Sequence, residues 1–366
     1  MSNHLLRDYR SHAGLPPLAG IATFAEAATP GLPIDDCVAR LKRHHWVFRR
    51  LHGIFVQRLT AEPLYEFKMT FSLHAHYCAE HAAAWRQRVG EMREPPLGLD
   101  TVPDAALEAW CDEVLAAPTT GALLLGLYEA ALPELAAALR RYQAETNRLV
   151  DHPSFRICRF ALIELEEMIA YGRAAGAALV TPAMRTDLAP WRALLDGLLA
   201  QAGGLDGAQP PGGGALQRLY SARPPAYDKV PRRDERFPDP YNMGVHAEVF
   251  LYDEKQPPAP KTLMLYYKRL REIDVPEMMA SIIAETPGKP WEYYAAMTRQ
   301  LWDEARHAMM GEVGFVQAGV DWRQYVRINF TWSRELNRQL SPIERHAVLY
   351  FIEQGLMPKT GKRFEW

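Results

Sequence analysis

Apolar residues recur every three or four positions along most of the chain, and almost no segment alternates with a period of two. This periodicity is typical of amphipathic helices and argues against strands. It predicts helices at residues 36–61, 64–93, 120–148, 152–176, 187–201, 244–254, 262–285, 291–317 and 342–356. The pattern therefore predicts an all-α fold.

Two segments interrupt the helical pattern. Residues 202–215, AGGLDGAQPPGGGA, cannot hold a helix and are typical of a linker or mobile loop. The proline-rich run at 223–241 is typical of an extended connector on the surface. We therefore predict an N-terminal helical bundle at 1–201, a linker at 202–241 and a C-terminal helical domain at 242–366, which agrees with the two domains expected from a length of 366 residues.

Composition narrows the classes of function. A chain with 48% hydrophobic and 23% charged residues is globular, and a net charge of -2 gives no whole-molecule attraction to nucleic acid or anionic membrane. The amino terminus lacks a basic start followed by an apolar core, and no stretch approaches the roughly 18 continuous apolar residues of a membrane helix. We therefore expect no membrane span and a cytoplasmic location. The four cysteines lack Cys-x-x-Cys spacing, which favours reduced, buried thiols.

The clearest chemical motif is Glu304-x-x-His307, in the middle of the predicted helix at 291–317. Residues three apart lean over the same helix face, so this carboxylate and imidazole can share one metal ion. Glu272 lies about as far before the turn at 286–290 as Glu304 lies after it, so a helix hairpin would bring them to the same depth. The plain alternative is a weak pair on a solvated helix face.

Two further carboxylates are candidate ligands. Glu277 ranks behind Glu272, because an Asp-x-x-Glu sequence that contains Pro276 is also the pattern of a capping box at a helix break. Glu353 lies in the last predicted helix, on the same face as a histidine seven residues earlier. Glu344, at the start of that helix, is expected to act as a cap instead.

The two halves of the chain share a pattern. Glu129-x-x-x-Pro in the first half matches Glu272-x-x-x-Pro in the second, and the next helix carries an acidic pair at matching distance from its first proline. In this alignment Ala170 takes the place of His307. We interpret the echo as a duplication whose first copy is degenerate, although a chance match among helical sequences would look similar. The first copy keeps carboxylates at Glu129, Glu164 and Glu167.

A core glutamate on one helix and Glu-x-x-His on its partner resemble the ferritin-like superfamily of di-iron and di-manganese carboxylate proteins, over residues 262–317. The resemblance implies ferritin-like helical bundles built from antiparallel hairpins, in two related halves. It also implies two ions of iron or manganese. Glu272 would be a first-helix ligand, Glu304 a bridging ligand and His307 a terminal ligand, and Glu353 would match the third-helix carboxylate.

The family pattern also has a fourth helix with a second Glu-x-x-His, and no such motif follows Glu353 before Trp366. Three explanations stay open. The natural chain continues further, another subunit completes the site in a homo-oligomer, or the first-half hairpin supplies carboxylates. A site with one metal ion or none is a further alternative.

The leading functional hypothesis is a di-metal, most simply di-iron, oxidoreductase that activates O2 to oxidise or hydroxylate a small organic substrate within the bundle. The alternative is a non-catalytic ferritin-like metal-binding or scaffold protein with an incomplete site. An enzyme acting on RNA is a third hypothesis, supported only by the basic run at 40–50. Such a run is more often the solvated face of a helix, so nucleic acid is not an expected partner.

Two other groups of side chains have competing interpretations. Aromatic residues near the motif could line a pocket, but aromatics at helical spacing are more often core packing. These are Tyr266, Tyr267, Tyr293, Tyr294 and Trp302. The first-half histidines could bind a metal or haem, but a structural role is favoured because they lack a carboxylate at ligand spacing. These are His44, His45, His52, His74, His76 and His81.

Overall fold

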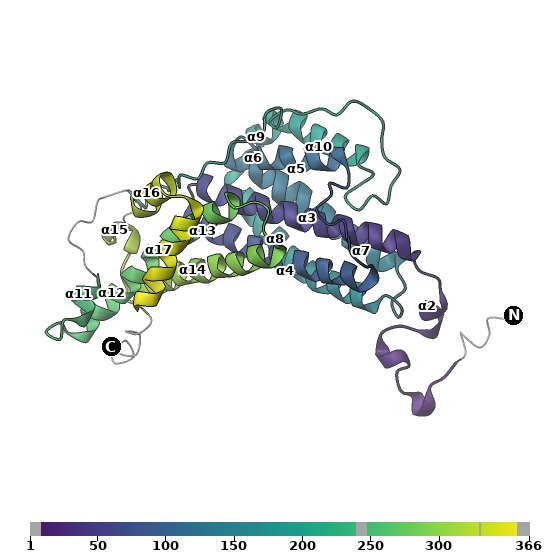
Figure 1. Cartoon of the computed structure of the whole chain (residues 1–366), viewed down its shortest axis with the longest axis horizontal. Helices are drawn as coiled ribbons and strands as arrows, with labels where there is room; N and C mark the ends of the chain where they lie inside the picture. The colour runs from purple at the N-terminus through teal and green to yellow at the C-terminus, as the bar shows by residue number, and fades with distance from the viewer. Residues whose placement is uncertain (1–8, 239–246, 329–330, 357–366) are drawn as a thin grey trace. The chain divides into compact units, whose positions relative to one another are not determined.

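The structure is a computed structural model that describes residues 9–238, 247–328 and 331–356 (Figure 1). All regular secondary structure in these residues is helical, which confirms the all-α prediction. The predicted helix start at 244 and the end of the predicted linker at 239–241 lie outside the described residues.

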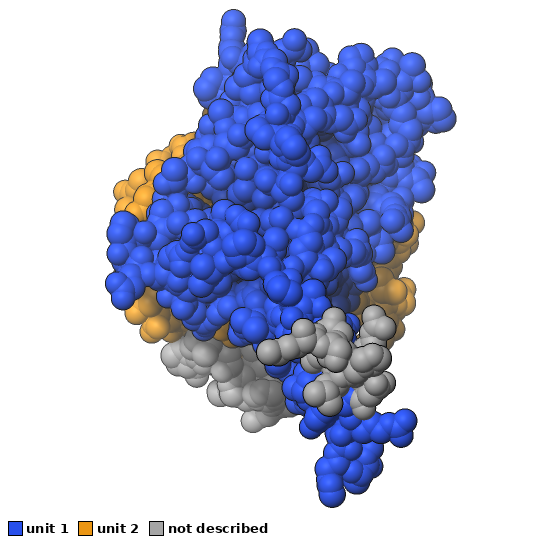
Figure 2. All heavy atoms as spheres, turned by 90° about the vertical axis from the view of Figure 1, so that its right-hand side faces the viewer, with its two compact units in different colours: residues 1–50, 80–225 blue, residues 51–79, 226–366 orange. Residues whose placement is uncertain are grey.

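The chain forms two compact units (Figure 2). Unit 1 comprises Met1–Arg50 and Glu80–Pro225, and unit 2 comprises Leu51–Ala79 and Ala226–Trp366. Residues 51–79, which the sequence placed in the N-terminal bundle, thus belong with the C-terminal part. The division falls within two long helices, α3 (Ile34–Ala61) and α4 (Tyr65–Met92), where no glycine or proline cluster marks a boundary.

Unit 1 is built around α7 packed along α8, with α10 packed on α5. Its α5 was not predicted from periodicity, although Asp104 caps it by accepting hydrogen bonds from the N–H groups of Ala106 and Leu107. Besides parts of α3 and α4, the unit contains η1 (His12–Gly14), η2 (Leu18–Gly20), α2 (Phe24–Ala28), α5 (Ala105–Leu115), α6 (Thr120–Leu124), the π-helix η3 (Leu125–Ala131), α7 (Leu132–Glu145), α8 (His152–Leu179), α9 (Pro182–Asp187) and α10 (Ala189–Gln201).

One helical stretch, Thr120–Glu145, is long and apolar enough to cross a membrane by length and composition alone. Within unit 1, however, 78% of its apolar window is buried. This is the environment of a core helix, and the stretch packs against α8.

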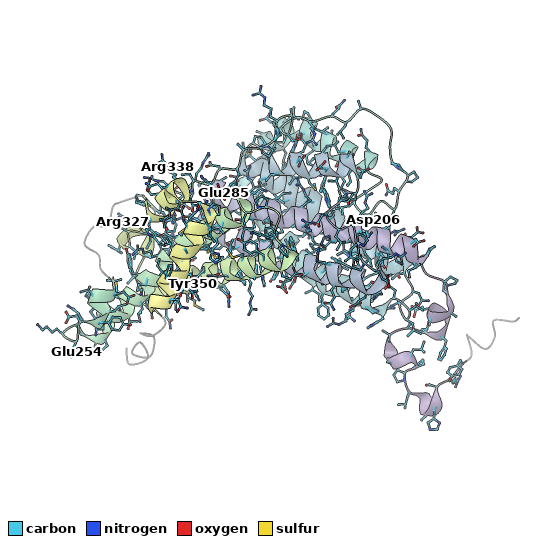
Figure 3. The ribbon with its side chains drawn as sticks, viewed as in Figure 1. Asp206, Glu254, Glu285, Arg327, Arg338 and Tyr350 are labelled. Carbon is cyan, nitrogen blue, oxygen red and sulfur yellow. The ribbon has the colours of Figure 1, made fainter. Side chains whose placement is uncertain are left out.

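The first part of the predicted linker is packed against unit 1. Arg43 donates hydrogen bonds to the carbonyl oxygens of Ala202 and Gly204, at 2.9 and 3.0 Å. Asp206, labelled in Figure 3, is 1% exposed and accepts two hydrogen bonds from Arg141. A glycine-rich composition indicates that the backbone can turn. It does not indicate which side chains elsewhere in the chain will bind the turn.

Unit 2 places α12 and α13 along α14, while α16 and α17 pack on α13. Tyr65 of α4 joins a core with Leu270, Ile273, Ala305 and Ala308. The unit contains residues 51–61 of α3 and 65–79 of α4, α11 (Ala247–Tyr252), α12 (Pro258–Arg271), α13 (Asp274–Ala284), α14 (Trp291–Gln317), α15 (Trp322–Tyr325), α16 (Thr331–Gln339) and α17 (Pro342–Leu356).

The helix predicted at 262–285 is two helices, α12 and α13, with a break at Glu272. A proline inside a helix lacks an N–H and clashes with the carbonyl four residues earlier, which for Pro276 is that of Glu272. The Glu272 carbonyl instead accepts a hydrogen bond from the N–H of Val275, at 3.0 Å. In unit 1, Pro133 stands in the same relation to Glu129, which lies in the π-helix η3. The repeated Glu-x-x-x-Pro pattern thus coincides with a helix irregularity in each unit.

Candidate metal centre

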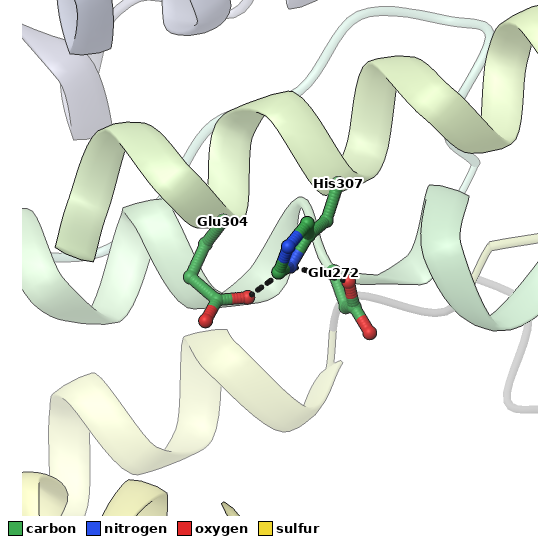
Figure 4. A group of neighbouring side chains, drawn as sticks. All are labelled: Glu272, Glu304 and His307. Carbon is green, nitrogen blue, oxygen red and sulfur yellow. Dashed lines mark hydrogen bonds and ion pairs between the residues drawn. The ribbon is translucent and has the colours of Figure 1, made fainter. Parts of the chain in front are cut away.

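Three candidate ligands converge in unit 2, where Glu272 at the end of α12 faces Glu304 and His307 on α14 (Figure 4). Nδ1 of His307 lies 3.2 Å from Oε2 of Glu272 and 3.2 Å from Oε2 of Glu304. One ligand atom from each residue lies within 4.8 Å of the other two. Glu304 is only 8% exposed, while the other two are half-buried. The plain alternative of a fully solvated surface pair therefore does not describe this group.

Close contact between α12 and α14 brings the ligands together. A Cβ atom at Gly311 would lie 2.3 Å from the backbone nitrogen of Leu270, and one at Gly314 would lie 2.4 Å from the ring of Tyr266. Real Cβ atoms essentially never approach so closely, so only glycine permits this helix spacing. Glu272 follows two residues after Leu270, and the close packing sets it opposite His307.

The carboxylates strongly perturb the histidine. Hydrogen bonds to Glu272 and Glu304 raise the pKa of His307 to about 9. Below that pH the protonated imidazole is the cation that balances the two carboxylates. Arg269 adds a further positive charge, 2.9 Å from Oε2 of Glu272.

The donor set fits a transition metal. Two carboxylate oxygens and an imidazole nitrogen suit iron or manganese, and three protein ligands leave coordination positions open. Glu304 and His307 would hold the ion from α14, and Glu272 would hold it from α12. A second ion would require further ligands beside these three residues.

Glu353 is placed near the group without joining it. Glu353 and Glu272 line the same cavity. Glu353 is exposed, but partial desolvation together with the negative charges of Glu304 and Glu272 raises the pKa of its carboxyl. The buried Arg345 anchors α17 by bonding to Ser281 and to Glu285, which is labelled in Figure 3.

Glu277 lies in a separate buried ion-pair network. Arg233 donates to its two oxygens at 3.0 and 2.8 Å, Lys68 lies 3.2 Å away, and Ser333 donates at 2.9 Å. Burial alone would raise the pKa of Glu277, but Arg233 and Lys68 hold it below the ordinary value. Since cations already neutralise this carboxylate, the structure does not bring Glu277 into the ligand group. The predicted surface connector therefore contributes a buried side chain, that of Arg233.

A capping role is confirmed for Glu344. Its Oε2 accepts hydrogen bonds from the backbone N–H and hydroxyl of Ser341, at 2.8 and 2.7 Å. The carboxylate thus satisfies the backbone N–H of Ser341, the residue before α17, which is half of a capping box.

The nearby aromatic side chains mainly pack against other residues. The ring of Tyr266 meets that of Phe315 edge-on at 5.8 Å, and Tyr267 and Trp302 pack against the core. Tyr294 donates a hydrogen bond to the carbonyl of Thr286 in the turn before α14. Tyr293 packs edge-on against Tyr294. None of the five lines the cavity beside Glu272.

The first-half counterpart has different partners. Glu129 accepts two hydrogen bonds from Arg185, both of 2.7 Å, which lower the pKa of that carboxyl. Glu164 pairs with His81 at 2.6 Å, and Glu167 is exposed. An arginine therefore neutralises the glutamate that corresponds to Glu272.

Burial changes the protonation of three of the first-half histidines. Burial lowers the pKa of His44 to about 4, and of His45 and His74 to about 3, so these imidazoles are neutral at pH 7. His52 shares a hydrogen bond of 2.7 Å with the hydroxyl of Thr298.

The basic run is engaged within unit 1. Arg40 pairs with Glu145, Arg49 with Asp100, and Arg50 with Asp112, while Arg43 binds the backbone at 202–205. These partners weaken the support that the run gave to an RNA-binding hypothesis.

Neither periodicity nor motif spacing predicts a binding role for Arg271. This residue lines the cavity beside Glu272 and sits within a cluster of basic residues at the end of α12. In sequence such a cluster is typical of a helix C-terminus, where cations complement the helix dipole. Only the fold shows that one of these side chains borders a cavity.

Comparison with protein-family models, with curated proteins and with solved structures finds no significant match to this chain.

Proposed function

We propose that unit 2 is an oxygen-dependent oxidoreductase with a ferritin-like iron or manganese centre at Glu272, Glu304 and His307. The observation that carries the proposal is the convergence of two carboxylates and one imidazole from two helices, within 4.8 Å. The metal would supply O2 activation, the chemistry for which carboxylate-rich helical bundles are suited.

The protein's own groups have distinct roles in this proposal. Glu304 is the most buried ligand and fixes the position of the centre between the helices. His307 must lose its proton before Nδ1 can bind a cation. Glu272 and Glu304, which pair with the imidazolium, would then bind the ion instead. Glu353, whose charge interacts with those of Glu304 and Glu272, is the candidate for a carboxylate that completes a two-ion site.

Elemental analysis of protein produced with iron and manganese available tests the proposal. We expect bound iron or manganese at about one or two ions per chain, as in carboxylate-bound centres of this kind. Glu304→Ala and His307→Ala should each remove most of it, because three ligands leave no redundancy. Asp303→Ala is the matched control, since it changes a neighbouring carboxylate on α14 that pairs with Arg306.

A well-folded chain that binds neither metal would refute the oxidase proposal. Metal that stays bound in both ligand variants would show that the binding site lies elsewhere. If metal binds but the loaded protein consumes no O2 with any organic substrate tried, the non-catalytic alternative is supported. Circular dichroism on each variant verifies that helical content is unchanged.

A further inference from the structure

A cavity of about 450 Å³ opens in unit 2 beside Glu272. This volume is typical of small-molecule sites. Four helices, α11, α13, α16 and α17, contribute its apolar wall. The apolar lining residues are Ala247, Val249, Val275, Trp332, Leu349 and Ile352. The cavity therefore offers an apolar surface to a molecule held next to the proposed metal centre.

Most charges in the wall have a protein partner. Lys268 pairs with Glu248, and Asp274 pairs with the buried Arg233. Glu272 pairs with His307 and Arg269. Because each of these side chains already pairs with an opposite charge, none of them is expected to attract a charged ligand strongly.

Arg271 is different. It lines the cavity and is half-buried. Its positive charge acts on Asp274, but within 9–238, 247–328 and 331–356 the guanidinium forms no direct ion pair, since Arg233 is the arginine in contact with Asp274. Glu353 lies in the same wall, where the negative charges of Glu304 and Glu272 act on it more strongly than the positive charges of His307 and Arg269. A guanidinium can bind a carboxylate through two parallel hydrogen bonds, which gives both affinity and orientation.

We infer that this cavity binds an amphiphilic organic anion, with a carboxylate on Arg271 and an apolar body against Val275, Leu349 and Ile352. The inference deepens the proposed function by naming a substrate class, and it rests on that function only for what happens to the bound molecule. Binding itself requires no metal.

Isothermal titration of the full chain, treated with a chelator, tests the inference with octanoate, octanol and octylamine. The three probes share an apolar body and differ in the head group. We expect octanoate to bind most tightly. Arg271→Gln should weaken octanoate about tenfold or more by removing a charge-assisted contact, while octanol stays unchanged. Arg299→Gln, an exposed arginine on α14, should leave all three unchanged.

Val275→Trp tests the apolar wall, because the larger ring should fill the space and abolish binding of octanoate and octanol alike. Equal affinity for the three probes, a preference for octylamine or no binding would each overturn the inference. The preference among head groups is measured on the unaltered chain, so the test does not depend on the folding of a variant. If octanoate binds but metal does not, the proposed function is refuted and this inference stands. If metal binds but octanoate does not, this inference is refuted and the proposed function stands.

Discussion

His307 differs from the other buried histidines because it lies between two carboxylates. Glu272 and Glu304 raise the pKa of His307 to about 9, whereas burial lowers that of His45 to about 3. The spacing of Glu304 and His307 made their meeting predictable, since residues three apart on a helix are always neighbours. The ion pairs of Glu277 were not predictable, because its partners Lys68 and Arg233 come from distant parts of the sequence.

We predict that metal binding releases a proton from His307 and strengthens as the pH rises from 6.5 toward about 9. Only the neutral imidazole binds a metal ion, so the pKa raised by the two carboxylates sets the upper end of this window. Titration calorimetry in buffers of different ionisation enthalpy measures the released proton. An affinity that does not change across this range would contradict the assignment of His307 as a ligand.

We also predict a loss of stability in acid from the buried histidines. Their pKa values in the folded chain are lower than the ordinary 6.5, so the unfolded chain binds protons first as the pH falls. Their contribution is complete above pH 6.5 and is lost as the pH falls toward about 4 for His44 and about 3 for His45. Each adds up to about 1.4 kcal/mol per pH unit to the slope.

Urea denaturation of His44→Phe and His45→Phe at several pH values measures this slope. A flatter dependence of the free energy of unfolding than in the unaltered chain is expected for each. His12→Phe, which changes an exposed histidine, should keep the original slope.

Among the elements, α14 and α17 begin and end at the predicted residues, 291–317 and 342–356. Each has a strong local signal at its start, a proline that precedes the helix or occupies its first position, and α14 also has sustained apolar periodicity. The break between α12 and α13 was not predicted, because the sequence on both sides of Glu272 keeps its helical period. The effect of Pro276 on the carbonyl of Glu272 is a matter of backbone geometry and not of periodicity.

Gly311→Ala should separate α12 from α14. Its new Cβ would lie 2.3 Å from the nitrogen of Leu270 and 2.7 Å from the carbonyl oxygen of Tyr266. Neither backbone atom can move without shifting α12, so we expect a loss of about 1–3 kcal/mol in the free energy of unfolding and weaker metal binding. Gly355→Ala on α17, where a Cβ meets no atom within 4 Å, should instead stabilise by about 0.5–1 kcal/mol. Equal denaturation midpoints for the two variants would contradict this account.

Pro276→Ala should affect the site more than stability. An alanine supplies the missing N–H and removes the ring that clashes with the Glu272 carbonyl, so α12 and α13 would tend to join. Glu272 would then rotate away from His307. We expect unchanged or higher thermal stability together with a metal affinity reduced about tenfold or more. Metal affinity equal to that of the unaltered chain would show that the break does not position Glu272.

At the scale of the whole molecule, composition predicted a linker but not the residues that bind it. Glu113 accepts hydrogen bonds from the N–H groups of Leu219, Tyr220 and Ser221, and from the indole of Trp191. Burial would raise the pKa of Glu113, but hydrogen bonds from Ser221 and the backbone lower it below its ordinary value. A carboxylate on α5 thus holds a segment more than 100 residues away in sequence, which local patterns do not reveal.

Glu113→Ala should release residues 219–221 from unit 1. The variant removes the acceptor from the N–H groups of Leu219, Tyr220 and Ser221, and for the buried N–H of Ser221 this loss costs about 1–3 kcal/mol. We expect faster limited proteolysis at 215–225 and a lower midpoint of thermal unfolding. The Glu108→Ala variant, with its change on the same helix, should be cleaved at 215–225 at the same rate as the unaltered chain.

The proline-induced break at Glu272 has a consequence for how metal exchange would proceed. Because Pro276, Gly311 and Gly314 fix the path of the two helices that carry the ligands, we expect the ligands to stay close together when no ion is bound. Removing the ion would therefore leave a folded apoprotein, unlike small zinc domains that unfold when chelated. Uptake and release would then be limited by ligand deprotonation and access, and metals of similar size could replace one another without refolding of the chain.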